Sequence, residues 1–274
     1  MRAEAYAHKM PDDQFKLSVS KSKCFDQCKK QYKYTYILRL PRKEASYHIL
    51  GHICHKTLET FHNFYIKGCL LPFNIALNDA FKSTLQEYKE KLTPEIKKEC
   101  LNLVGQYLNL ISTDPENHPV KNVIACEKKF EIKLADNIIL NGAIDLIRED
   151  NYNGSKLLHI GDYKTTKNKK YLKNDWQQLL TYCFVMLEEN PKLEKIRASY
   201  ILLRHDYEYI TRDFSREEIL AVKQQYLDYA NKMMNEKEFA ASPTILCGWC
   251  DHLSLCAEGQ KKVNPIKTNG QISW

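Results

Sequence analysis

The spacing of apolar residues predicts that the first part of the chain is mainly helical. Between about Tyr47 and Ile66, apolar side chains recur every three to four residues, as on one face of an amphipathic helix. Similar stripes run over residues 81–92 and 96–111, with a break at Thr93-Pro94. The segment 18–40 begins with serines that could cap a helix. We therefore expect a helical N-terminal part.

The spacing of apolar residues changes from a helical to a strand pattern in the middle of the chain. Residues 123–134, 138–148 and 157–164 favour strands separated by polar turns. A helix over 175–188 follows, then strands over 196–204 and 208–214. Ser215 and Glu218 form a capping box for a helix that reaches about Met234. This order predicts an α/β domain built around one sheet.

Composition is that of a globular protein, with 43% hydrophobic and 27% charged residues. The apolar runs are too short to span a membrane, and the N-terminus is too polar for a signal peptide. We therefore expect a cytoplasmic protein with no membrane partner. The net charge of +7 permits a polyanionic partner without requiring one.

Two predicted strands carry carboxylates among apolar residues. Asp145 interrupts the apolar run 143–147, and Asp162 follows Ile160-Gly161. Because strand side chains alternate, Asp162 and Lys164 share one face. A buried carboxylate requires compensation, and a divalent cation is one possibility. The alternative is that both aspartates lie at solvated strand ends.

Four short motifs occur in a fixed order along the chain. They are Gly51-x-x-x-His55-x-x-x-Glu59, residues 141–145 (NGAID), residues 161–165 (GDYKT) and residues 178–182 (QLLTY). This order resembles the RecB-like branch of the PD-(D/E)XK nucleases. The resemblance implies a restriction-endonuclease-like core, in which helices flank a central mixed sheet.

The resemblance also implies site residues. Metal ligands would be His55, Asp145, Asp162 and the backbone carbonyl of Tyr163, and oxygen ligands with one imidazole suit Mg²⁺ or Mn²⁺. Glu127 on the preceding strand is a weaker candidate, and we interpret it as a surface charge.

Catalysis would involve five side chains. In addition to the two aspartates, Lys164 would orient or help deprotonate the attacking water. Gln178 and Tyr182 would position the DNA backbone or the metal ligands. The expected catalytic residues are thus Asp145, Asp162, Lys164, Gln178 and Tyr182.

Ten cysteines are many for an intracellular chain. Cys247, Cys250 and Cys256 form a C-x₂-C-x₅-C pattern that requires a distant fourth ligand, for which Cys28 is favoured over Cys24. Zinc, including a Cys₃His site with His252, is one possibility.

The cysteine pattern also resembles the cluster-bearing relatives, namely the AddB-type helicase–nucleases and the CRISPR-associated RecB-like exonucleases. That resemblance implies a [4Fe–4S] cluster on Cys28, Cys247, Cys250 and Cys256, an iron–sulfur clamp joining the N- and C-terminal segments. The chain departs from the family in having Lys29 where proline often follows the first cysteine.

The resulting expectation is one nuclease domain over 18–259. It has a helical insertion at 68–121, cluster-binding segments at 18–40 and 240–259, and a flexible tail at 260–274. The resemblance implies an exonuclease on single-stranded or frayed-end DNA in repair, recombination or CRISPR spacer acquisition. A helicase or CRISPR integrase would be a separate partner, since no Walker A sequence occurs.

Two other functions stay open, a DNA-binding assembly subunit with a silent or partner-dependent site and a zinc-ribbon structural protein. Lys167, Lys169 and Lys170, which follow the predicted catalytic strand, are either phosphate contacts or a solvated face.

Overall fold

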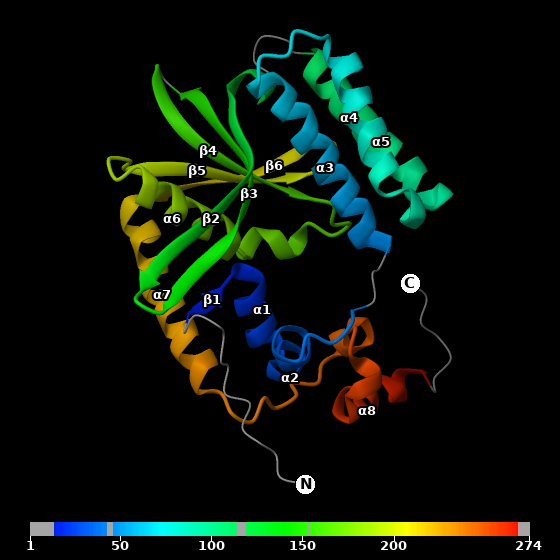
Figure 1. The fold of residues 1–274 in the computed structure, drawn as a ribbon, viewed down its shortest axis with the longest axis vertical. Coiled ribbons are helices and arrows are strands. Elements are labelled where there is room, and N and C mark those ends of the chain that lie inside the picture. Colours follow the sequence, from blue (N-terminus) through cyan, green and yellow to red (C-terminus); the bar gives the residue numbers. More distant parts are fainter. Residues whose placement is uncertain (1–13, 43–45, 114–118, 153, 268–274) are drawn as a thin grey trace. The chain divides into compact units, whose positions relative to one another are not determined.

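The computed structural model describes residues 14–42, 46–113, 119–152 and 154–267 (Figure 1). The N-terminal elements are β1 (Phe15–Leu17), α1 (Val19–Gln27), α2 (Lys29–Tyr32), the π-helical turn η1 (Lys33–Ile37), α3 (Ser46–Ile66), α4 (Phe73–Glu87), η2 (Lys89–Lys91), α5 (Pro94–Thr113) and η3 (Pro119–Asn122). The remaining elements are β2 (Val123–Ala135), β3 (Ile138–Tyr152), β4 (Ser155–Lys164), η4 (Lys170–Asn174), α6 (Gln177–Glu189), β5 (Lys195–Leu202), β6 (Glu208–Ser215), α7 (Arg216–Asn235), η5 (Ile245–Trp249), η6 (Leu253–Leu255) and α8 (Ala257–Lys267).

The strands form one six-stranded mixed sheet. Its order is β1-β3-β4-β5-β6, with β2 also paired to β3. The β1–β3 and β4–β5 pairs are parallel, whereas β3–β4 and β5–β6 are antiparallel. The parallel β4–β5 pair is connected through α6, as a parallel crossover requires. The expected α/β fold with a mixed central sheet and flanking helices is therefore confirmed.

The chain divides into two compact units. The first comprises the described parts of residues 1–43, 131–141 and 223–274, and the second comprises those of 44–130 and 142–222. In the second unit, α3, α4 and α5 pack together. They share one hydrophobic core with the sheet face that carries Leu146, Tyr163 and Ile201. The other face of β4, which carries Asp162, is the one on which α6 lies, because Lys164 there contacts Gln178.

The helical and strand spacings of apolar residues in the sequence predicted most of the observed elements correctly. The 47–66 pattern corresponds to α3, which buries Leu50, Ile53, Leu58 and Phe61. The segment 18–40 begins as expected with a helix that Ser18 caps, but the helix does not continue through the segment. It is interrupted at Cys28, whose φ of −164° and ψ of 110° are extended. The three-residue strand β1 was not predicted because it is too short to show alternation.

The C-terminal part is more ordered than its polar composition indicated. Helix α8 extends to Lys267 and buries Val263, so part of the expected tail at 260–274 is helical. Residues 268–274 lie outside the described residues. None of the described helices combines the length and the apolar character needed to cross a membrane.

A chain of polar side chains crosses the sheet on the face opposite Asp162. Asp150 Oδ2 lies 2.7 Å from His159 Nδ1, and His159 Nε2 lies 2.7 Å from Ser199 Oγ. Ser199 Oγ is in turn 2.7 Å from Thr211 Oγ1. This order of groups resembles a hydrolytic triad, but Ser199 has no exposed surface, so no substrate could reach its hydroxyl. The chain of hydrogen bonds is therefore structural.

Burial lowers the pKa of His159, although its hydrogen bond to Asp150 acts in the opposite direction. In the unfolded chain His159 takes up a proton near its ordinary pKa of 6.5, whereas the folded protein binds that proton only at lower pH. Stability is therefore fully present above pH 6.5 and is lost as the pH falls below it.

We expect the urea concentration at the unfolding midpoint to decrease as the pH is lowered from about 8 to 5. In H159Q this decrease should be smaller, because glutamine does not titrate. The measurement is urea unfolding at several pH values. A H159Q variant with the same pH dependence as the wild type would contradict this assignment.

Candidate active site and cysteine group

Asp145 fills a gap between two neighbouring strands. The antiparallel register of β3 and β4 extends only as far as Leu146↔Gly161. Immediately beyond it, the Tyr163 backbone N–H donates to Asp145 Oδ2 at 2.9 Å. A carboxylate thus takes the place of a ladder carbonyl, which holds Asp145 at the point where the strands separate.

Two glycines of the sequence motifs permit close approaches. A Cβ at Gly161 would stand 2.8 Å from Ile201 Cδ1, so a larger residue there would force the adjacent strand side chains to shift. A Cβ at Gly51 would lie 3.3 Å from Thr165 Oγ1. Gly51 therefore allows α3 to lie against the end of β4, and this contact brings His55, one turn further along α3, to the same place.

His55 reaches Asp145 from the helical layer. Its Nδ1 is 3.3 Å from Asp145 Oδ2, and the ring is also hydrogen-bonded to the Tyr163 backbone. The imidazole is 28% exposed and the Asp145 side chain 11% exposed. The two groups therefore border a site that solvent can still enter.

Glu127 completes a possible metal-binding group. His55, Glu127 and Asp145 offer ligand atoms that all lie within 4.8 Å of one another, and no other such group occurs among the described residues. Glu127 has a φ of +46°, an uncommon conformation for this residue type, and it is partly buried. Sequence reasoning ranked Glu127 as the weaker candidate, and the structure places it beside His55 and Asp145. No apolar pattern could have revealed it, because the backbone conformation sets its direction.

Asp162 lies outside that group and pairs with a lysine. Its side chain is 1% exposed, and its Oδ2 lies 2.5 Å from Lys164 Nζ. Lys164 Nζ also donates to Gln178 Oε1 at 2.9 Å, and Gln178 Nε2 donates to Tyr182 Oη at 2.8 Å. The one-turn spacing of Gln178 and Tyr182 on α6 produces this alignment. Four of the five expected catalytic side chains are thus linked by direct contacts.

The acidic groups perturb one another. Burial raises the pKa of Asp145 well above its ordinary value, and the nearby Asp162 raises it further. Burial likewise raises the pKa of Glu127. Burial lowers the pKa of His55, so its imidazole is held neutral and can donate a lone pair to a cation. Groups with such shifts, gathered beside a lysine, are typical of a catalytic site.

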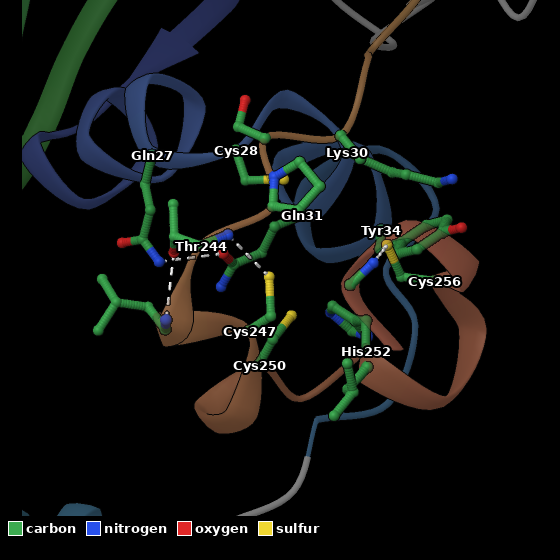
Figure 2. Close-up of a pocket in the computed structure, with 16 residues that line it drawn as sticks. Gln27, Cys28, Lys30, Gln31, Tyr34, Thr244, Cys247, Cys250, His252 and Cys256 are labelled. Carbon is green, nitrogen blue, oxygen red and sulfur yellow. Dashed lines mark hydrogen bonds between the residues drawn. The ribbon is translucent and has the colours of Figure 1, made fainter. Parts of the chain in front are cut away.

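In the first unit, four cysteines line one hollow, into which Figure 2 shows the side chains pointing. They are Cys28, Cys247, Cys250 and Cys256. Cys24 does not line the hollow, and burial raises the pKa of its thiol to about 12.

Backbone N–H groups point at the three C-terminal sulfurs. The Thr244 N–H donates to Cys247 Sγ at 3.4 Å, and the Gly259 N–H donates to Cys256 Sγ at 3.3 Å. Cys250 is hydrogen-bonded to the backbone of His252. Burial raises the pKa of the Cys250 thiol, whereas its hydrogen bond with the His252 backbone acts in the opposite direction. N–H groups that point at sulfurs are typical of the surroundings of metal-bound cysteines.

Side chains after Cys28 connect this segment to the C-terminal cysteines. Tyr34 Oη donates to the Leu255 carbonyl at 3.1 Å, and Thr35 Oγ1 lies 3.1 Å from His252 Nε2. Lys30 forms an ion pair with Glu258 at 2.8 Å. The expected proximity of the N-terminal segment and the C-terminal cysteines is therefore present within the first unit.

Comparisons with known proteins concern the family and the fold of the chain. Residues 16–257 match the family model of the PD-(D/E)XK nuclease superfamily. A candidate exonuclease from Eubacterium rectale has a similar structure, with a TM-score of 0.50, 11% identity and 92% of each chain covered. The protein SSO0001 aligns over 88% of this chain and 85% of its own, with a TM-score of 0.38 and 14% identity. No curated protein matches the chain. Since the family model covers most of its length, the chain belongs to the PD-(D/E)XK nuclease superfamily.

Proposed function

We propose that this protein is a metal-dependent DNA nuclease of the RecB-like branch that acts as an exonuclease on single-stranded or frayed-end DNA. The observation that carries the proposal is the juxtaposition of His55, Glu127 and Asp145 with the Asp162–Lys164 pair. The preference for exonuclease activity comes from the motif resemblance, and the E. rectale neighbour carries the same description.

The residues fit a hard divalent cation. His55, Glu127 and Asp145 offer one imidazole and two carboxylates, with Asp162 and the Tyr163 carbonyl as additional oxygen donors, a set that suits Mg²⁺ or Mn²⁺. When bound, such an ion polarises a phosphate and lowers the pKa of a coordinated water.

Lys164 supplies a positive charge at the same place. Gln178 and Asp162 both contact its ammonium group, so its direction is fixed on two sides. A fixed cation of this kind can orient the attacking water and offset the charge that develops on the phosphate. Tyr182 supports Gln178 and thus acts as a positioning residue.

We further propose a [4Fe–4S] cluster on Cys28, Cys247, Cys250 and Cys256. The four cysteines that line the hollow offer the Cys₄ thiolate ligation that such a cluster requires. His252 Nε2 lies 3.1 Å from Thr35 Oγ1, so in a Cys₃His zinc site the imidazole would bind the metal through Nδ1.

The cluster would serve structure, since its ligands come from both ends of the chain. Closing so long a loop restricts the unfolded chain and stabilises the folded one. A helicase or an integrase as a separate partner belongs to the same proposal, in repair, recombination or CRISPR spacer acquisition.

Metal binding should depend on pH. Because the pKa of Asp145 and that of Glu127 are raised, a cation must displace protons, and affinity should weaken as the pH falls from about 8 to 6. Calorimetric titration of Mg²⁺ or Mn²⁺ in buffers of different ionisation enthalpy measures both the affinity and the proton release. D145N should lose binding, whereas D136N, at an exposed turn, should match the wild type. Equal affinity at both pH values would contradict the assigned ligands.

Loss of a carboxylate should abolish cleavage. We expect D162A or D145A to reduce hydrolysis of end-labelled DNA by at least about 100-fold, because a bound metal supplies several kcal/mol of transition-state stabilisation. K164A should lose most activity yet still bind metal. D136N serves as the control. Activity near that of the wild type in D162A or D145A would reject the nuclease assignment.

The two N-terminal cysteines should differ. C28S and C250S should remove iron and sulfide, bleach the absorbance of the anaerobically purified protein and lower its melting temperature, since thiolate–metal bonds contribute on the order of 10 kcal/mol. C24S should retain the cluster. Metal analysis that finds zinc alone, or a C24S variant as colourless as C28S, would contradict the ligand set.

A further inference from the structure

The segment after Lys164 forms a basic hollow in the second unit. Its volume is about 650 Å³, and it is lined by Lys167, Asn168, Lys169, Lys170 and Asn174. The described residues of this lining offer cationic and amide donors, and none of them is a carboxylate. The first lining residue, Lys167, follows Lys164 of the candidate active site by three positions in the sequence. Lysine and asparagine side chains are common contacts to phosphate oxygens.

The start of this segment is anchored to the turn between β5 and β6. Three successive carbonyls accept hydrogen bonds from three successive residues. The pairs are Lys164 with the Leu203 N–H (3.0 Å), Thr165 with Arg204 Nη1 (2.6 Å) and Thr166 with His205 Nε2 (3.2 Å). A segment fixed in this way loses little conformational entropy when it binds.

The middle and the end of the segment are also held. Asn168 N–H donates to Thr166 Oγ1 at 3.2 Å, and Asn168 Oδ1 accepts from the Lys170 N–H at 3.0 Å. At the end, Tyr200 Oη donates to the Asp175 carbonyl at 2.6 Å. The lysines therefore project from a preformed backbone.

The lysines differ in their partners. Lys169 forms an ion pair with Glu208 of β6. Lys167 and Lys170 are exposed, and no carboxylate of the described residues forms an ion pair with either of them. Lys167 and Lys170 can therefore bind a polyanion directly, whereas Lys169 must first break its ion pair with Glu208.

We propose that residues 165–174 form a preformed cradle for the sugar-phosphate backbone of a single DNA strand, and that Glu208 limits its affinity by holding Lys169. This inference rests on the proposed function, because the strand in the cradle would be the one presented to Lys164. Lys167 and Lys170 contact phosphates directly, and the β5–β6 turn fixes their position relative to the site.

The first test removes the two exposed charges. Binding of a fluorescein-labelled oligothymidine is followed by anisotropy in EDTA, which prevents any metal-dependent cleavage, between about 50 and 200 mM salt. In K167Q/K170Q the plot of log affinity against log salt concentration should become less steep by about 1.4, since each single-strand phosphate contact contributes about −0.7 to its slope. Affinity at 0.1 M salt should fall by about 25-fold, which is the same change in slope converted to a ratio.

The matched control carries the same charge change elsewhere. Lys97 and Lys98 are exposed on α5, and K97Q/K98Q should leave the slope unchanged. A K167Q/K170Q slope equal to that of the wild type, or an equal loss in the control, would overturn the cradle.

The second test should increase binding. E208Q releases Lys169, so we expect a slope steeper by about 0.7 and an affinity about fivefold higher at 0.1 M salt. E189Q, which removes the partner of Lys128 on α6, is the control for the same charge change. An E208Q affinity no higher than that of E189Q would overturn the role of Glu208.

The cradle and the nuclease can fail separately. Binding that follows these predictions in a wild-type protein that never cleaves DNA would retain the cradle and reject the nuclease. Metal-dependent cleavage by the wild type, together with unchanged DNA binding in K167Q/K170Q, would reject the cradle and retain the nuclease.

Discussion

Mutual repulsion between Asp145, Asp162 and Glu127 is the constraint on which the second unit depends. Each carboxylate is wholly or partly withdrawn from water, and burial raises the pKa of Asp145 and of Glu127. Lys164 offsets part of this charge through its ion pair with Asp162, and the Tyr163 N–H offsets part through its bond to Asp145. What remains is a cluster that a divalent cation would neutralise, which is the physical basis of metal dependence in a site of this kind.

The surrounding fold maintains this unfavourable arrangement. Gly161 leaves room for the Leu146 and Ile201 side chains of the adjacent strands, and Gly51 allows α3 to approach the end of β4. Glu127 adopts a positive φ that directs its carboxylate toward His55. Such local costs persist only where the packing around them is extensive, and the core shared by α3, α4, α5 and the sheet supplies that packing.

The segments around the cysteine group are held together by individual polar contacts. The first unit has short elements around it, and its N-terminal and C-terminal segments are joined by individual contacts such as Tyr34 with Leu255 and Lys30 with Glu258. Contacts of this kind stabilise only modestly at a surface. The backbone N–H groups of Thr244 and Gly259 donate to the sulfurs of Cys247 and Cys256 and so fix their positions. The proposed cluster would add bonds far stronger than the contacts that surround these sulfurs.

The sequence by itself determined most elements and selected most of the candidate site residues. The helical spacing of apolar residues located α3, and the alternation of apolar and polar residues located β2, β3 and β4. The order of the motifs pointed to His55, Asp145, Asp162, Lys164, Gln178 and Tyr182, because these signals depend on spacing along the chain. Tertiary structure alone decided the position of Glu127, the interruption at Cys28 and the pairing of the short strand β1. It also decided that Asp162 pairs with Lys164 while Glu127 joins His55 and Asp145. These features depend on backbone dihedrals and on contacts between distant residues, and neither leaves a periodic signal in the sequence.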